Sequence, residues 1–312
     1  MAERLIIDTD PGQDDAFAIL LALASPEFEV LGLTAVAGNV PVSTTAANCR
    51  RLVEIAGKSH IPAFAGCDRP LLRPARHAAD IHGEGGIDGY DFAAPAHPVE
   101  SKHAVDWLVE TLLASPEKSV TITPLGPMTN IAAALIREPK IASRIKRIVN
   151  MGGGFFEGGN IAPAAEFNIL VDPEAAAIVF KSGVALASVP IDCTLNALTP
   201  DSWIADLAAL KTPVGDACAG MMRFFEAYGN KKYGTKTRPL HDALAVGYAL
   251  WPDLFSGRHC NVEIETSSPL TLGMTVVDWW GVSGRRANCF WVKSCDAEQF
   301  YARMLARLAL LK

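Results

Sequence analysis

Apolar residues alternate between two patterns along most of the chain. Short β-branched and aliphatic runs predict strands at 4–9 and 28–37, while longer runs rich in Ala and Leu predict helices at 14–23 and 42–56. The alternation continues with predicted strands at 119–123, 145–149 and 184–191 and predicted helices at 128–136, 173–182 and 239–250. Strands that alternate with helices of this length indicate an α/β fold, with an open, mostly parallel, Rossmann-like sheet flanked by helices.

The pattern changes near the carboxyl terminus. Shorter apolar runs predict strands at 262–264, 274–277 and 289–292, which could form an antiparallel edge of the sheet, and a final helix is predicted at 297–310. The sequence contains no internal repeat and no low-complexity linker. We therefore expect a single domain over residues 1–312.

Composition and charge narrow the choice of partners. Half of the 312 residues are apolar and 20% are charged, which suits a chain with a sizeable core and excludes general disorder. The formal charge is −6, and the Lys and Arg residues are scattered. Because binding to phosphates needs a surplus of basic residues on one face, nucleic acid is not an expected partner.

The sequence also bears on location. No apolar run approaches the roughly 18 residues that a membrane-spanning helix needs. The apolar run near the start is too short for the core of a secretory signal. Seven widely spaced cysteines, without a C-x-x-C pair, indicate buried thiols rather than a disulfide or zinc framework. We therefore expect a cytoplasmic protein without a membrane partner.

Four carboxylates lie within eight residues from the end of the first predicted strand onward: Asp8, Asp10, Asp14 and Asp15. Carboxylates this close raise one another's pKa unless a cation or hydrogen-bond donors compensate, and a hard divalent cation is the simplest compensator. Pro11 and Gly12 make a tight turn, so Asp10 and Asp15 could face one ion. Helix capping could account for about two of the four carboxylates. The cluster therefore favours a metal site over capping alone.

Two other metal-dependent interpretations fit less well. An EF-hand, counted from Asp8, would need acidic residues where the sequence has Gly12 and Ile19. Phosphatases of the haloacid dehalogenase type also open with a strand followed by Asp-x-Asp, which would make Asp8 a nucleophile beside Asp10. Gly12 stands where they usually have Thr. A phosphatase using Asp8 and Asp10 stays a distant alternative.

Further polar residues follow other predicted strands, at the edge of a parallel sheet where ligands bind. Each segment alone could be a turn, a flexible loop or a helix cap. Together they place Asp, Asn, Glu and His side chains around one crevice at the carboxyl ends of the strands. The segments are 36–39, 81–89, 123–130, 150–168 and 241–244.

The ordered set of motifs resembles the nucleoside hydrolases, the inosine-uridine preferring nucleoside N-ribohydrolase family. The opening stretch from Asp8 to Asp15 matches the DTDPGxDDA signature of that family. The other matching segments are 37–39, 82–83, 125–130, 151–153, 166–169 and 241–243. Residues 244–312 carry no motif that matches.

The resemblance implies hydrolysis of the N-glycosidic bond of ribonucleosides of the uridine, inosine and cytidine type, which releases ribose and the free base. It also implies a bound Ca²⁺, held by Asp10, Asp15, the backbone carbonyl of Leu125 and Asp242. The ion would lower the pKa of a bound water, Asp10 would take its proton, and the sugar would pass through an oxocarbenium-like state. Family members are usually homotetramers or dimers, so a homo-oligomer is expected.

The resemblance also implies the substrate contacts. Ribose would be held by Asp14, Asn39, Glu166 and Asn168, with Phe167 in the same motif, and the 5′-hydroxyl by Asn160 and the region of Met151. The leaving base needs a proton or a hydrogen bond, for which His241 is the first candidate and His82 the second. A non-catalytic nucleoside-binding protein is disfavoured by the intact set of acids.

Base preference depends on the segment before His241. Phe224, Tyr228 and Lys232 share one helical face, where they could contact the base or belong to the core. An aromatic and basic face resembles the nonspecific inosine-uridine members, and a pyrimidine-specific ribonucleoside hydrolase stays the alternative. His241 argues against the purine-specific group.

Overall fold

The computed structural model describes residues 2–233 and 239–312, with the side chains of 228–233 excepted. Strands of these residues form one sheet in the order β3-β2-β1-β4-β5-β6-β9-β7-β8. Their bounds are β1 Glu3–Thr9, β2 Phe28–Ala35, β3 Ala63–Ala65, β4 Val120–Pro124, β5 Ile145–Met151, β6 Leu186–Val189, β7 Phe255–Ile264, β8 Thr275–Asp278 and β9 Cys289–Cys295.

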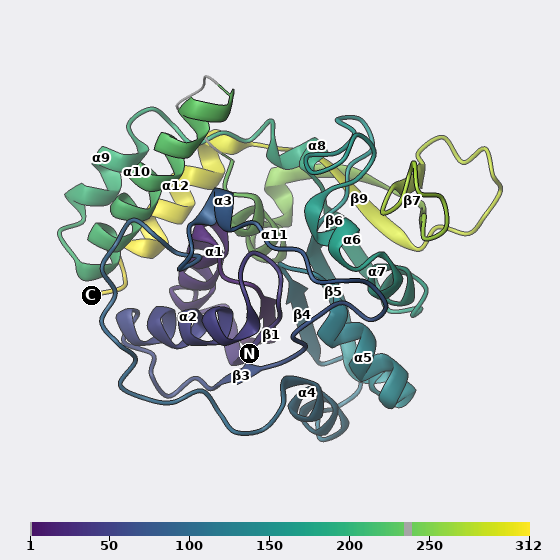
Figure 1. Ribbon diagram of the computed structural model, residues 1–312, viewed down its shortest axis with the longest axis horizontal. Helices are drawn as coiled ribbons and strands as arrows, with labels where there is room; N and C mark the ends of the chain where they lie inside the picture. The colour runs from purple at the N-terminus through teal and green to yellow at the C-terminus, as the bar shows by residue number, and fades with distance from the viewer. Residues whose placement is uncertain (1, 234–238) are drawn as a thin grey trace.

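Pairing is parallel from β3 through β9 and antiparallel where β7 meets β9 and β8. The α/β class and the mostly parallel sheet are therefore confirmed, and so is the antiparallel edge. Figure 1 shows the strands passing through the middle of the molecule, with helices on either side.

The helices connect the parallel strands, as βαβ units require. Their bounds are α1 Gln13–Leu23, α2 Val42–Ile55, α3 Ala79–His82, α4 Ala104–Leu113, α5 Thr129–Arg137, α6 Phe167–Val171, α7 Pro173–Phe180, α8 Ile191–Thr194, α9 Trp203–Ala209, α10 Pro213–Tyr233, α11 His241–Leu250 and α12 Ala297–Leu308. Short 3₁₀ helices span Pro139–Arg144 and Pro252–Leu254. Among the described residues, no helix combines the length and apolar character needed to cross a bilayer.

Several boundaries differ from the predicted ones, most of all that of β7, which begins at Phe255 and not at residue 262. Two of the differences have a local reason. The strand predicted at 184–191 is shorter, because Ile191 already belongs to α8, which begins after Pro190. The helix predicted at 239–250 begins at His241, because Pro239 forms an isolated β-bridge with Leu198. The strand β3 and the helices α3, α4, α6, α8 and α9 were not predicted.

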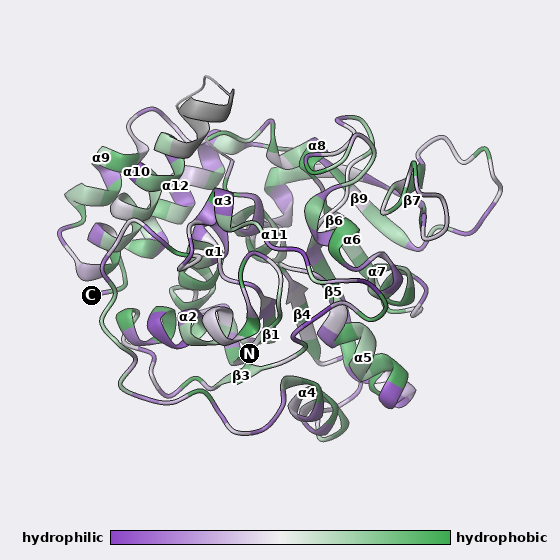
Figure 2. Ribbon diagram, viewed as in Figure 1, coloured by the Kyte–Doolittle hydropathy of each residue, from purple (hydrophilic) through white to green (hydrophobic). Residues whose placement is uncertain are grey.

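The first strand is buried on both faces, which accounts for its uninterrupted apolar run. Leu5 and Ile7 face the core under α1, α2 and α9–α12, whereas Ile6 faces the core under α4, α5 and α7. Figure 2 shows apolar and polar residues alternating along α2, which buries one side only. The sheet is thus the middle of three layers.

Chain order reverses beside β1, since β2 lies on one side of it and β4 on the other. In sheets of this kind the crevice for ligands opens at such a switch point, outside the carboxyl ends of the strands. The segments that leave β1, β2 and β4 therefore meet in one place.

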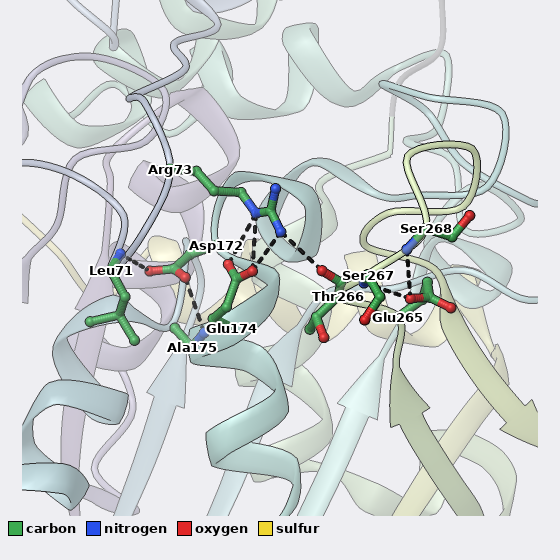
Figure 3. Close-up of polar contacts among 9 residues, drawn as sticks. All are labelled: Leu71, Arg73, Asp172, Glu174, Ala175, Glu265, Thr266, Ser267 and Ser268. Carbon is green, nitrogen blue, oxygen red and sulfur yellow. Dashed lines mark hydrogen bonds and ion pairs between the residues drawn. The ribbon is translucent and has the colours of Figure 1, made fainter.

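A long connection along this rim is tied to α7 (Figure 3). The backbone N–H of Leu71 donates to Asp172 Oδ2 over 2.9 Å, and Arg73 forms an ion pair with Glu174 at 2.6 Å. Arg73 also donates to the carbonyl of Thr266 over 3.0 Å. These bonds anchor the segment that continues to α3 and His82.

Candidate active site

The acidic loop, residues 8–15, runs from the end of β1 into the first turn of α1. Thr9 Oγ1 donates to Asp15 Oδ1 over 2.5 Å, and the N–H of Gly12 donates to Asp15 Oδ2 over 2.9 Å. Asp15 therefore satisfies the first turn of α1, as the capping interpretation expects for one of the four carboxylates. Asp10, Asp14 and Asp15 are buried all the same.

Asp10 sits in a pocket built from backbone. The N–H of Asn39, which follows β2, donates to Asp10 Oδ2 over 2.7 Å, and Asn39 Nδ2 donates to the Asp10 carbonyl over 3.1 Å. A Cβ added at Gly38 would lie 2.0 Å from Oδ2, and one at Gly126 would lie 2.1 Å from Oδ1. Glycine is therefore required on both sides of this carboxylate.

Asp8 is held by a different set of neighbours. Its Oδ1 accepts hydrogen bonds from Thr34 Oγ1 at 2.5 Å and from Asn130 Nδ2 at 2.8 Å. Its Oδ2 is sealed from solvent and has no partner among the described residues. Burial raises the pKa of Asp8 to about 7. A carboxylate enclosed in this way is poorly placed to attack phosphorus, which weighs against the phosphatase alternative.

Three carboxylates converge at the starts of α1 and α11. One oxygen each from Asp14, Asp15 and Asp242 lies within 4.8 Å of the others. The helices α1 and α11 pack against each other, which brings Asp242 to the acidic loop across most of the sequence. The tightest group thus contains Asp14, for which the resemblance implied a ribose contact, while Asp10 lies beside it.

The carboxylates of this cluster are buried and repel one another. Burial, with repulsion from Asp15 second, raises the pKa of Asp10 well above its usual range and that of Asp14 to about 7. Burial and the neighbouring acids also raise the pKa of Asp242. Within the described part of the chain, one oxygen each of Asp10, Asp14 and Asp242 is buried without a partner. Oxygen atoms that lack donors and repel one another suit a hard divalent cation.

The carbonyl of Leu125, just after β4, lies beside Asn168 and Met151. Asn168 Nδ2 donates to that carbonyl over 2.7 Å and lies 3.3 Å from the carbonyl oxygen of Met151. A carbonyl oxygen has a second lone pair, so the bond from Asn168 leaves room for another partner at Leu125. Asn168 and Met151 are buried beside this carbonyl.

Glu166 caps α6 from a buried position. Its carboxylate accepts the N–H groups of Asn168 at 2.9 Å, Gly153 at 3.1 Å and Ile169 at 3.3 Å. Burial nevertheless raises the pKa of Glu166 to about 7, although these bonds lower it. Glu166 therefore joins the end of β5 to the start of α6 and can also hold a proton near neutrality.

Asn160 and Phe167 lie outside this buried group. Asn160 is exposed, and its Oδ1 accepts the N–H of Phe167 over 3.0 Å. The structure thus uses Asn160 to brace the loop before α6, and the Phe167 side chain is half-buried. The side chain of Tyr228 lies outside the described residues.

Two histidines lie near each other, and His82 contacts the segment that carries the acidic cluster. His241 begins α11, and its Nδ1 lies 2.6 Å from Thr194 Oγ1. His82 ends α3, and its Nδ1 lies 2.7 Å from Gln13 Oε1. Burial lowers the pKa of both rings to about 4, and His241 contributes to the shift at His82. Both imidazoles are therefore neutral at pH 7.

Sequence reasoning gave no role to Gln13 or Thr194, which support these rings, whereas Phe225 lies in the segment before His241 that was expected to contact the base. Thr194 and Gln13 bond the two imidazoles, and Phe225 stacks on His82 with ring centroids 5.9 Å apart. Gln13 occupies the variable position of the opening motif, and that was the one signal available. Thr194 carries no local signal, because its partner is far away in the sequence.

Comparisons with known proteins agree with this geometry. The family model described as inosine-uridine preferring nucleoside hydrolase matches residues 5–302. An uncharacterized protein of Schizosaccharomyces pombe is 47% identical over 308 residues, covering 99% of each chain. The pyrimidine-specific ribonucleoside hydrolase RihA of Shewanella sp. (strain ANA-3) is 41% identical over 311 residues, which cover 99% of this chain and 97% of that relative.

Solved structures are similar along the whole length as well. A plant nucleoside hydrolase, the PpNRh1 enzyme, superposes with a TM-score of 0.92 at 30% identity and 99% coverage of both chains. A purine-preferring ribonucleoside hydrolase from Gardnerella vaginalis gives a TM-score of 0.93, also at 30% identity and 99% coverage of both chains.

Proposed function

The chain belongs to the inosine-uridine preferring nucleoside hydrolase family, enzymes that hydrolyse ribonucleosides, and from that premise we propose how it does so. We propose that it uses Ca²⁺ to cleave the N-glycosidic bond of uridine, inosine and cytidine. One observation carries the proposal. Asp14, Asp15 and Asp242 converge beside Asp10, with buried oxygens that lack partners among the described residues.

The donor set fits the cation. Asp10, Asp15, Asp242 and the carbonyl of Leu125 would hold it, and Asp14 lies close enough to share it. All of these donors are oxygens, as Ca²⁺ prefers. When bound, the ion would neutralise part of the carboxylate charge and lower the pKa of a water molecule.

Asp10 is the proposed general base. Its Oδ2 is fixed by the N–H of Asn39, while its Oδ1 has no partner among the described residues. A proton taken from water would therefore go to Oδ1.

The same carboxylates favour the transition state. As the N-glycosidic bond breaks, positive charge develops on the ribose ring, and fixed negative charge in a water-poor pocket stabilises it. Asn39, Glu166 and Asn168 are held by backbone bonds, so they are preorganised for the ribose hydroxyls. Contacts of this kind raise the rate only if they strengthen as the ring flattens.

The leaving base would meet the two imidazoles. His241 is the first candidate to donate a proton or hydrogen bond, and His82 is the second. Both rings are neutral near pH 7, so each acts through one N–H and one lone pair.

A second candidate function is restriction to pyrimidine ribonucleosides. The observation that favours it is the similarity to the pyrimidine-specific RihA of Shewanella. The homo-oligomeric state, tetramer or dimer, stays a prediction.

The test is release of reducing sugar from uridine, cytidine, inosine, adenosine, guanosine and their 2′-deoxy forms, with Ca²⁺ present. We expect Asp10→Ala to lower kcat by about 10²–10⁴-fold, as loss of a general base does. Thermal unfolding should show that the variant is folded. Wild-type turnover in Asp10→Ala would contradict the mechanism, and release from pyrimidine nucleosides alone would select the second candidate.

A further inference from the structure

Gln13 joins the opening motif to the loop that carries His82. Its side chain is fully buried, although it is polar. Gln13 Nε2 donates to the carbonyl of His82 over 3.0 Å and to the carbonyl of Asp88 over 3.2 Å. Gln13 Oε1 lies 2.7 Å from His82 Nδ1. The amide therefore contacts both the backbone and the ring of His82.

These three contacts determine which atom of Gln13 faces the ring. An amide nitrogen has two hydrogens, and the two carbonyls take both. If Oε1 and Nε2 of Gln13 exchanged places, Oε1 would face the carbonyl oxygens of His82 and Asp88, and no hydrogen would lie between these acceptors. The oxygen must therefore face the ring, and because it can only accept, His82 Nδ1 must carry the hydrogen.

The bond to Gln13 also fixes which way the ring faces, because a ring turned over would present carbon Cδ2 to the amide oxygen in place of Nδ1. A Cβ added at Gly12 would lie 2.6 Å from His82 Nδ1 and 2.7 Å from Cε1, so that edge of the ring lies directly against the Gly12 backbone. Phe225 stacks on the ring at an interplanar angle of 25°. In the neutral ring the lone pair is left on Nε2, which no described residue hydrogen-bonds.

We propose that Gln13 is a positioning residue that holds His82 in its Nδ1–H form, so that Nε2 accepts a hydrogen bond from a ring N–H of the bound base. Uracil and hypoxanthine carry such an N–H beside a carbonyl. Cytosine and adenine present a lone pair at the corresponding ring nitrogen. The inference rests on the proposed function, since it requires a base next to His82. It leaves the role of donor to the leaving base with His241, because the one hydrogen of the His82 ring is then bound to Gln13.

Two variants separate the acceptor of Gln13 from its role as an anchor. Gln13→Met and Gln13→Glu both lose the bonds donated to the carbonyls of His82 and Asp88. Only Gln13→Glu keeps an oxygen that can accept from Nδ1. Asn48→Ala is the matched control, because Asn48 Nδ2 donates to the carbonyl of Gly85 over 2.7 Å in the same loop without bonding the ring.

The direct measurement is the tautomer of His82, read from long-range ¹H–¹⁵N NMR correlations of the imidazole. We expect the Nδ1–H pattern in the wild type, Gln13→Glu and Asn48→Ala. In Gln13→Met we expect a shift toward Nε2–H, the form that a free imidazole favours. A wild-type ring in the Nε2–H form, or an unchanged tautomer in Gln13→Met, would overturn the proposal.

The kinetic measurement is the ratio of kcat/KM for uridine to that for cytidine, with Ca²⁺ present. In Gln13→Met, a ring in the Nε2–H form would lose the hydrogen bond accepted from uracil and could instead donate one to the ring nitrogen of cytosine. We expect this exchange to lower the ratio about tenfold. Gln13→Glu and Asn48→Ala should keep the ratio. An unchanged ratio in Gln13→Met, or an equal loss in Asn48→Ala, would reduce Gln13 to a loop anchor and overturn the proposal.

The two measurements test the proposed function and the role of Gln13 separately. If no nucleoside releases ribose, the proposed function is wrong. The NMR tautomer then still decides whether Gln13 sets the state of His82.

Discussion

Gly126→Ala is expected to disable the enzyme while leaving the fold in place. Gly126 follows Leu125 at the end of β4, and its φ lies outside the left-handed region, so the backbone tolerates alanine. The new Cβ would lie 2.1 Å from Asp10 Oδ1 and 2.7 Å from Asp10 Cγ. Asp10 has no free space opposite, because a Cβ at Gly38 would already lie 2.0 Å from Oδ2.

The magnitude follows from this distance. A carbon and an oxygen rest at about 3.3 Å, so the 2.1 Å contact forces the carboxylate to move by about 1.2 Å. A misplacement of about 1 Å in a catalytic group can cost about 10²-fold in rate. Overpacking of this kind costs about 1–3 kcal/mol of stability. We therefore expect kcat to fall about 100-fold in a protein that still unfolds cooperatively.

The assay is ribose release from uridine and inosine with Ca²⁺ present, together with thermal unfolding. Gly38→Ala displaces the same carboxylate from the other side and should give a similar loss. Gly57→Ala is the control, since nothing lies within 4 Å of its added Cβ and its φ of +66° brings only backbone strain. That variant should lose stability and keep kcat. Wild-type kcat in both Gly38→Ala and Gly126→Ala would refute the role of Asp10.

Two further predictions concern the carboxylates. In the metal-free protein, the pKa of Asp14 is raised to about 7. Between about pH 4 and pH 7, Asp14 is therefore protonated in the folded protein but ionised in the unfolded chain. The free energy of unfolding should fall as pH rises through this range. Ca²⁺ competes with protons for this site, so its Kd should be lower at pH 8 than at pH 5. A Ca²⁺ concentration that is 100 times the Kd at pH 8 should add about 2.7 kcal/mol there, and the same concentration should raise Tm less at pH 5. An equal rise in Tm at both pH values would count against the site. Asp8→Asn should keep ribose release within about tenfold, because Asp8 bonds Thr34 and Asn130 rather than the cluster, and its replacement costs about one hydrogen bond. Release of phosphate from a nucleoside monophosphate, abolished by Asp8→Asn, would instead support the phosphatase alternative.

Much of the fold could be predicted because its signals are local. The run Leu5 to Ile7 has the apolar character of a strand buried on both faces, and α1 follows it without a long loop. The parallel sheet follows from the alternation of strands and helices. The ends of helices and strands were harder to predict. Pro239 lies outside α11 because it pairs with Leu198, a residue that is remote in the sequence.

The residues of the candidate site could be predicted from local motifs, but most of their contacts could not. The opening motif, with Asp10, Asp14 and Asp15, is contiguous, and the motifs at Glu166 and Asp242 follow in family order. The family, the reaction class and a candidate oxygen-rich cation site were therefore predictable. The sequence could not show that Asp14 and Asp242 approach within the tightest group while Asp8 turns toward Asn130.

The sequence by itself determined the layered α/β fold, the membership of a hydrolase family and the residue types of the site. Only the tertiary structure decided the surroundings of each side chain. Gln13 and His82 are 69 residues apart in the chain, and Thr194 and His241 are 47 apart. Periodicity reports which face of an element is buried, but it carries no information on which remote donor meets a given acceptor. That choice depends on how helices pack across the sheet, and it sets the protonation and orientation of the groups proposed to meet the base.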